Sequence, residues 1–77
     1  MSKGDIEHCV HKSLAKYFQD LDGSPPHDLY EMVISCVEKP LFEYILARAG
    51  GKQLLAAQYL GINRNTLRKK LQQHNLL

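Results

Sequence analysis

The segment from Gly51 to Leu77 reads GKQLLAAQYLGINRNTLRKKLQQHNLL, and the interpretation of the whole chain starts from it. It contains five basic residues and no acidic one, whereas the preceding residues hold five basic and eight acidic side chains. The net charge of +2 therefore combines a basic end of +5 with a mildly acidic body of −3. This asymmetry favours a polyanionic partner, and nucleic acid is the first candidate.

A short helix and a tight turn are predicted at the start of the basic segment. Residues 53–60 form the helix, with three apolar residues turned inward: Leu54, Ala57 and Leu60. Gly61 can adopt the positive φ of a turn, and Ile62 can seal the corner behind it. A small residue, a turn glycine and an apolar residue in this order are typical of a helix-turn-helix.

The second helix of this motif is predicted to begin after Asn63, a good N-cap, and to run to about residue 73. Leu67 and Leu71, four residues apart, hold its inner face. The polar residues between them share a broad outward face because successive helical residues turn by about 100°.

That outward face carries the side chains that recognise duplex DNA. Arginine can donate two hydrogen bonds to guanine, asparagine can pair with adenine, and a recognition helix offers its N-terminal residues to base edges. Arg64 and Arg68 are therefore the candidates for base readout, with Asn65 on the same face. Hydroxyl, amide and ammonium groups suit phosphates, which adds the other candidates: Asn63, Thr66, Lys69 and Lys70.

The acidic body is predicted to contain two helices. After a polar, frayed start at residues 1–4, one apolar stripe marks the first helix: Ile6, Val10, Leu14, Tyr17 and Leu21. The second begins at Asp28, where Glu31 completes a capping box, and ends before Gly50. Pro40 lies inside it, and the apolar pattern resumes in phase afterwards, which favours one kinked helix over two.

The second helix is apolar over most of its circumference and needs neighbours on more than one side. A chain of 77 residues buries only about 60–65% of the surface its unfolded form exposes. A second copy is the best source of the missing neighbours. Cys9 and Cys36 fall in apolar helical patterns and are expected to be buried, reduced thiols of a cytoplasmic protein.

Other functions lack a suitable pattern of residues. His8, Cys9 and His11 do not reach the four ligands of a structural zinc site, so no metal or other cofactor is expected. We predict no enzyme and no small-molecule substrate, because no nucleophile elbow or phosphate-binding loop occurs. No apolar run is long enough to span a membrane. His27 and His74 are expected at the surface.

The motifs resemble those of the bacterial Fis family, the factor for inversion stimulation. The residues that carry this resemblance in the basic segment are Gly50-Gly51-Lys52-Gln53, Ala56-Ala57, Leu60-Gly61-Ile62-Asn63-Arg64 and Thr66-Leu67-Arg68-Lys69-Lys70-Leu71. In the body they are Lys16-Tyr17-Phe18, Asp28-Leu29-Tyr30-Glu31 and Val37-Glu38-Lys39-Pro40-Leu41. The resemblance runs from about residue 5 to the end, although the last third is also similar to the DNA-binding domains of NtrC-type activators.

The resemblance implies an all-α fold with four helices per subunit in an intertwined homodimer. Residues 5–49 would form a four-helix dimerisation core with a second copy, and residues 50–77 would place one helix-turn-helix in each of two successive major grooves of bent DNA. The family positions that contact DNA are occupied here by Asn63, Arg64, Thr66, Arg68 and Lys69, with Arg64 as the main reader of guanine. The resemblance also implies degenerate target sites, an association with the nucleoid and a role in transcription regulation.

Three features depart from the family pattern. Lys52 replaces a usual asparagine and is expected to keep a phosphate contact, whereas Leu54 replaces a small polar residue and is not. Gln72 and Gln73 stand where basic residues are common, which indicates fewer flanking phosphate contacts. An N-terminal arm has no counterpart before the first helix, which argues against stimulation of a recombinase.

Two alternatives to this interpretation stay open at the level of the sequence. The chain could be the DNA-binding domain of an NtrC-type activator, detached or separately expressed. It could also be a protein-interaction module whose basic helix docks an acidic partner, since runs such as Arg68-Lys69-Lys70 are often only solvated surface.

Overall fold

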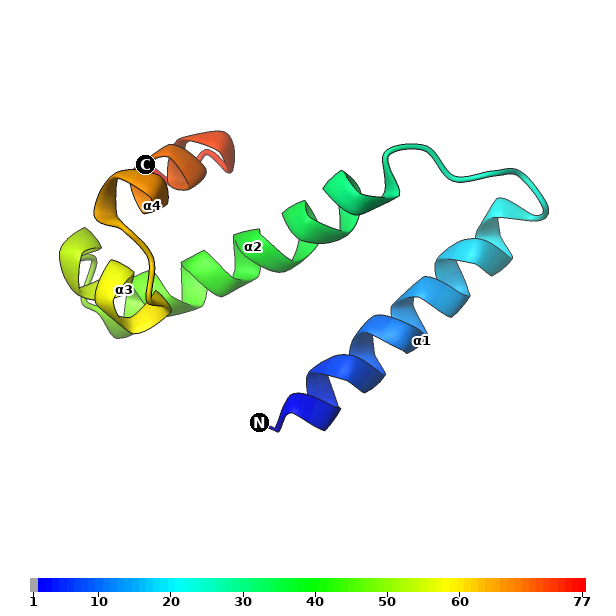
Figure 1. Cartoon of the computed structure of the whole chain (residues 1–77), viewed down its shortest axis with the longest axis horizontal. Helices are drawn as coiled ribbons and strands as arrows, with labels where there is room; N and C mark the ends of the chain where they lie inside the picture. Colours follow the sequence, from blue (N-terminus) through cyan, green and yellow to red (C-terminus); the bar gives the residue numbers. More distant parts are fainter. Residues whose placement is uncertain (1) are drawn as a thin grey trace.

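The computed structural model describes residues 2–77 and contains four helices, with no strand in that range (Figure 1). The helices are α1 (Lys3–Leu21), α2 (Leu29–Arg48), α3 (Gln53–Leu60) and α4 (Arg64–Gln73). The predicted all-α class and the number of helices are confirmed. The bounds of α3 and α4 also match the predicted helix-turn-helix.

The molecule is elongated rather than spherical. Its principal extents are 44 × 27 × 17 Å and its radius of gyration is 14.8 Å, whereas a compact chain of this length would have a radius of about 11.5 Å. Helices α1 and α2 diverge from the loop that joins them, and α3 and α4 gather at the opposite end of α2 (Figure 1). One subunit alone is therefore open along the side where α1 faces α2.

Helix α1 begins earlier than the sequence pattern predicts. Ser2 caps it: the Asp5 backbone N–H donates to Ser2 Oγ at 3.3 Å, and the Ser2 backbone N–H donates to Asp5 Oδ2 at 3.1 Å. This reciprocal capping box satisfies two amides that would otherwise lack partners. The prediction of a frayed start is thus wrong for Lys3 and Gly4, while Met1 lies outside the described residues.

Helix α2 begins where expected, but its predicted capping box is wrong. Asp28 is the N-cap by position, yet its backbone is left-handed, with φ 49°, and its side chain makes no capping hydrogen bond. A carboxylate caps a helix from an extended backbone, which directs it at the first free amides. The left-handed Asp28 follows a turn with two prolines and does not have that geometry.

The middle and end of α2 agree with the prediction. Pro40 lies inside a helix that continues from Leu29 to Arg48. Beyond it, Gly50 and Gly51 have φ values of 64° and 82°, and the Gly51 N–H donates to the Leu46 carbonyl at 2.8 Å. Left-handed residues of this kind end a helix and turn the chain sharply. Here they direct it into α3.

The closed core lies where the end of α2 meets α3 and α4. Six buried residues form it: Phe42, Ala49, Ala56, Ala57, Leu67 and Leu71. The prediction of an inward Ala57 is confirmed and Leu60 packs against the core in part, but Leu54 is 55% exposed. The small Ala56-Ala57 pair faces the neighbouring helices, and Leu54 is turned about 200° from Ala56. The inward prediction for Leu54 is therefore wrong.

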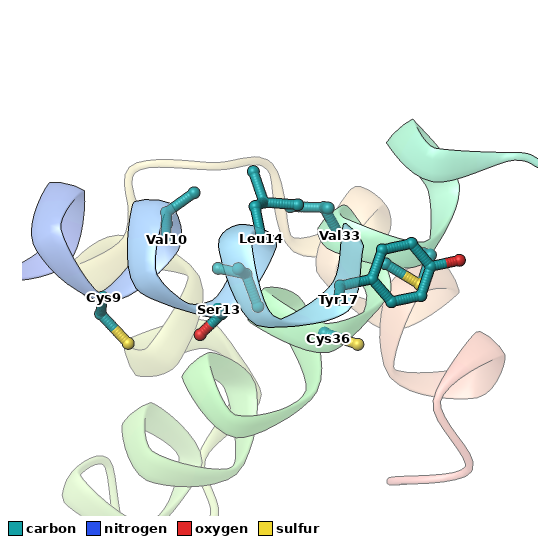
Figure 2. Close-up of a pocket in the computed structure, with 9 residues that line it drawn as sticks. Cys9, Val10, Ser13, Leu14, Tyr17, Val33 and Cys36 are labelled. Atoms are coloured by element: carbon teal, nitrogen blue, oxygen red, sulfur yellow. The ribbon is translucent and has the colours of Figure 1, made fainter. Parts of the chain in front are cut away.

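Helix α1 contributes no buried residue to this core. Instead, α1 and α2 border an apolar groove of about 630 Å³ that includes Ile6, Val10, Val37, Leu41 and Tyr44. A second hollow of about 250 Å³ continues along the helices, and Figure 2 shows the side chains that line it from both.

Both cysteines line this open side of the molecule. Cys9 and Cys36 are free thiols, and both are exposed in a single subunit. The expectation of burial is thus wrong for one chain, because α1 and α2 diverge instead of closing against each other.

Candidate nucleic-acid interface

The turn between α3 and α4 sets the direction of the second helix. Gly61 has a φ of 73°, and its N–H donates to the Ala57 carbonyl at 2.9 Å. The Ile62 N–H donates to the same carbonyl at 3.1 Å, and Ile62 packs against the core. Only glycine adopts this left-handed backbone at low cost. The predicted roles of the glycine and of the apolar corner residue are confirmed.

Asn63 caps α4 as predicted. Its Oδ1 accepts a hydrogen bond of 2.7 Å from the Asn65 N–H, and its backbone is extended, as N-capping requires. The first turn of α4 is therefore held firmly at the point where Arg64 emerges.

The two faces of α4 differ sharply. Leu67 and Leu71 have no exposed surface and fix the helix against α2 and α3. The predicted contact residues on the remaining face are all exposed: Asn63, Arg64, Asn65, Thr66, Arg68 and Lys69. Gln72 and Gln73 extend this face, and α4 contains no acidic residue. The result is a basic, hydrogen-bonding surface on a rigid helix.

Lys52 lies apart from α4, at the N-cap position of α3, and its side chain is exposed. It makes no side-chain capping hydrogen bond. Its ammonium can therefore reach an anion beside the first turn of α3, where backbone amides also point outward.

Lys70 differs from the other predicted contact residues because it has an intramolecular partner. Its Nζ lies 2.8 Å from Glu38 Oε2 on α2, and His74 Nε2 lies 3.1 Å from Glu38 Oε1. Hydrogen bonds from Lys70 and then from His74 lower the pKa of Glu38 below its usual value of 4.5, against the opposing effect of its burial. A phosphate contact by Lys70 would compete with this carboxylate.

The histidine at the end of α4 is not a surface residue, so that prediction is wrong. The His74 side chain is only 10% exposed, and its ring meets Phe42 edge to face, with centroids 5.8 Å apart. His27, by contrast, is exposed as predicted. Sequence reasoning missed the Glu38 cluster because its members are 32 and 36 residues apart along the chain. The acidic residue four positions before a buried phenylalanine was the available signal.

Two further observations concern other classes of site. Within residues 2–77, no group of three or more His, Cys, Asp or Glu side chains is arranged to hold a metal ion. None of the described helices combines the length and the apolar composition needed to cross a membrane.

A capped, basic second helix joined by a left-handed glycine to a helix with an alanine pair defines a helix-turn-helix protein. Comparison with known proteins identifies the group within this class. Residues 34–74 match the family described as "Bacterial regulatory protein, Fis family". This chain belongs to the Fis family, as its motifs predicted.

Relatives extend the match beyond the helix-turn-helix. A Fis-like DNA-binding protein of Ralstonia nicotianae is 56% identical over 77 residues, which is the whole of both chains. A protein of the same description from Neisseria meningitidis serogroup A is 51% identical over 95% of this chain and 92% of its own. DNA-binding protein Fis of Proteus mirabilis is 45% identical over 92% of this chain and 72% of its own. The similarity therefore includes α1 and α2.

Proposed function

We propose that this protein binds duplex DNA through the exposed face of α4. The observation that carries the proposal is the orientation of that helix: Leu67 and Leu71 are fully buried, so the arginines between and before them face solvent. Membership of a family of bacterial regulatory proteins supports a regulator rather than an enzyme, as predicted. The relatives named as DNA-binding proteins support the same partner.

Each exposed side chain has a chemical role in this proposal. Arg64 reads guanine by a bidentate hydrogen bond in the major groove, with Arg68 as the second base reader. Arg64 follows the Asn63 cap directly and is thus placed at the N-terminal end of α4, which recognition helices bring to the base edges. The remaining proposed contacts position the protein on the backbone or beside the bases: Asn63, Asn65, Thr66, Lys69 and Lys52.

The proposed assembly is an intertwined homodimer. Along the open side of one subunit, Ile6 is 50% exposed, Val37 46%, Leu41 42% and Tyr44 66%. These residues border one groove between α1 and α2, and a second copy of the same helix pair supplies an apolar surface of matching character. Residues 5–49 are the proposed dimerisation part and residues 50–77 the DNA-binding part of one domain.

The proposed dimer presents two copies of α4 to successive major grooves and bends the DNA between them. Phosphate contacts and DNA deformability then supply affinity without many base contacts, which suits degenerate sites. We infer from this a role in the cytoplasm as a nucleoid-associated protein that regulates transcription. The glutamines at positions 72 and 73 limit the flanking phosphate contacts.

Arg64→Ala tests the proposed reading mode. The variant is expected to lose about 1–3 kcal/mol of binding free energy and its preference at one base pair. Binding is measured by fluorescence anisotropy on a duplex selected from a random-sequence pool and on the unselected pool. Arg48→Ala is the matched control, because Arg48 is an exposed arginine in the last turn of α2. Equal binding by Arg64→Ala and the wild-type protein would sink the proposal.

A salt series separates this function from docking to an acidic protein. DNA binding through phosphates makes log affinity fall linearly with log salt, with a slope of about −0.9 for each phosphate neutralised. A flat response with duplex DNA would favour the protein-interaction alternative.

A further inference from the structure

Glu38 on α2 holds two side chains of α4 at once. Its Oε2 lies 2.8 Å from Lys70 Nζ, and its Oε1 lies 3.1 Å from His74 Nε2. No other ion pair forms among residues 2–77. Its side chain is 18% exposed and that of His74 is 10% exposed, so this contact is partly sheltered from water.

The cluster has two levels, one helical turn apart on each helix. Glu38 and Phe42 follow one another on the same face of α2, and Lys70 and His74 do so on α4. The Phe42 and His74 rings meet at an interplanar angle of 64°, beside the carboxylate contacts. We refer to Glu38, Phe42, Lys70 and His74 as the α2–α4 clamp.

We propose that Glu38 is a positioning residue for the recognition helix: through Lys70 and His74 it fixes the orientation of α4 on α2 and keeps the Lys70 ammonium away from DNA phosphates. This inference rests on the proposed DNA-binding function. It assigns Lys70 a role different from the phosphate contact that its place in a basic run predicts.

The physical reason is the contrast between apolar and polar contacts. Leu67 and Leu71 hold α4 at its distance from the core, but apolar burial is non-directional. Charge-assisted hydrogen bonds have a defined length and direction and are about twice as strong as neutral ones. The clamp therefore adds a directional constraint at the C-terminal half of α4, opposite the end that carries Arg64.

The clamp also changes the charge that α4 offers to DNA. The Lys70 ammonium is neutralised by Glu38 within the protein, whereas Lys69, one position earlier, is exposed and has no carboxylate partner among residues 2–77. Counterion release reflects only the cations that neutralise phosphates. Neighbouring lysines in one run are thus expected to differ in their contribution to salt dependence.

The first experiment compares Lys70→Gln with Lys69→Gln by fluorescence anisotropy over a salt series, using the selected duplex. Lys69→Gln is expected to reduce the slope of log affinity against log salt by about 0.9. Lys70→Gln is expected to leave the slope unchanged. An equal reduction in both variants would overturn the inference, while a wild-type protein that does not bind the duplex would overturn the proposed function instead.

The second experiment tests positioning with the isosteric change Glu38→Gln, and thermal melting checks that the variant is folded at the assay temperature. The ratio of affinities for the selected duplex and the unselected pool is expected to fall by about 2- to 10-fold. The double variant Glu38→Gln/Lys70→Gln is expected to show no further loss, because the two changes remove the same contact. An unchanged ratio in Glu38→Gln, or additive losses in the double variant, would contradict the inference.

Discussion

Leu41 tests the proposed dimer because it lies in the groove between α1 and α2 and is 42% exposed in one subunit. Fully burying a leucine side chain contributes about 1.5–3 kcal/mol. Covering the exposed 42% would therefore contribute about 0.6–1.3 kcal/mol in each subunit. A two-fold symmetric dimer covers the residue twice, so Leu41→Ala is expected to weaken association by roughly 1.2–2.5 kcal/mol, or about 7- to 60-fold in the dimer dissociation constant.

Sedimentation equilibrium over a dilution series measures that constant directly. Lys39→Ala is the matched control, since Lys39 is exposed on α2 two residues away and does not border the groove. It is expected to leave the dissociation constant within a factor of about two, as surface substitutions usually do. The reasoning fails if Leu41→Ala associates as tightly as Lys39→Ala, or if the wild-type protein is a stably folded monomer at micromolar concentration.

Two further predictions concern stability. Because the pKa of Glu38 is lowered in the folded state, the unfolded chain binds more protons as the pH falls, so its stabilising effect is complete above about pH 5 and is lost on acidification; thermal melts followed by circular dichroism from about pH 6 to pH 3 are expected to fall less steeply for Glu38→Gln, and equally steep curves would contradict this. Gly61→Ala is expected to cost about 1–2 kcal/mol in urea unfolding, because its φ is 73° while open space surrounds the added methyl group. Gly4→Ala, inside α1, is the opposite-sign control and is expected to stabilise by up to about 1 kcal/mol, so a loss equal to that of Gly61→Ala would refute the backbone explanation.

Local signals in the sequence predicted the helix-turn-helix closely. Asn63, Gly61 and the leucine pair at positions 67 and 71 act through contacts with residues a few positions away, and each takes its expected role. Pro40 was also placed correctly within a continuous helix, because the apolar spacing on its two sides stays in phase. Helix periodicity and capping are short-range properties, so one sequence contains them.

The errors arise where backbone geometry or distant contacts decide. Asp28 has the composition of a cap but a left-handed backbone, which a carboxylate at that spacing does not reveal. Leu54 faces outward because the alanine pair packs more closely against the neighbouring helices. Glu38 and His74 meet across 36 residues, and their partnership depends on how α4 crosses α2. These three features require the tertiary arrangement.

The candidate DNA contacts divide in the same way. The exposed set on α4 follows from its periodicity once the leucines are placed inside. Lys70 looks identical to Lys69 in a basic run, and only its 2.8 Å contact with Glu38 separates the two. Equal charges in a sequence therefore need not make equal contributions to a binding surface.

The absence of any buried residue from α1 has a consequence for how the protein forms. The α2–α3–α4 core can fold within one chain, because the helices that build it follow one another in the sequence. In the proposed dimer, α1 gains its neighbours only when two chains meet, so its folding is a second-order step that depends on concentration. Freshly made chains at low abundance would then hold a finished recognition helix before they hold a finished body, and the rate of synthesis would set when paired readers appear.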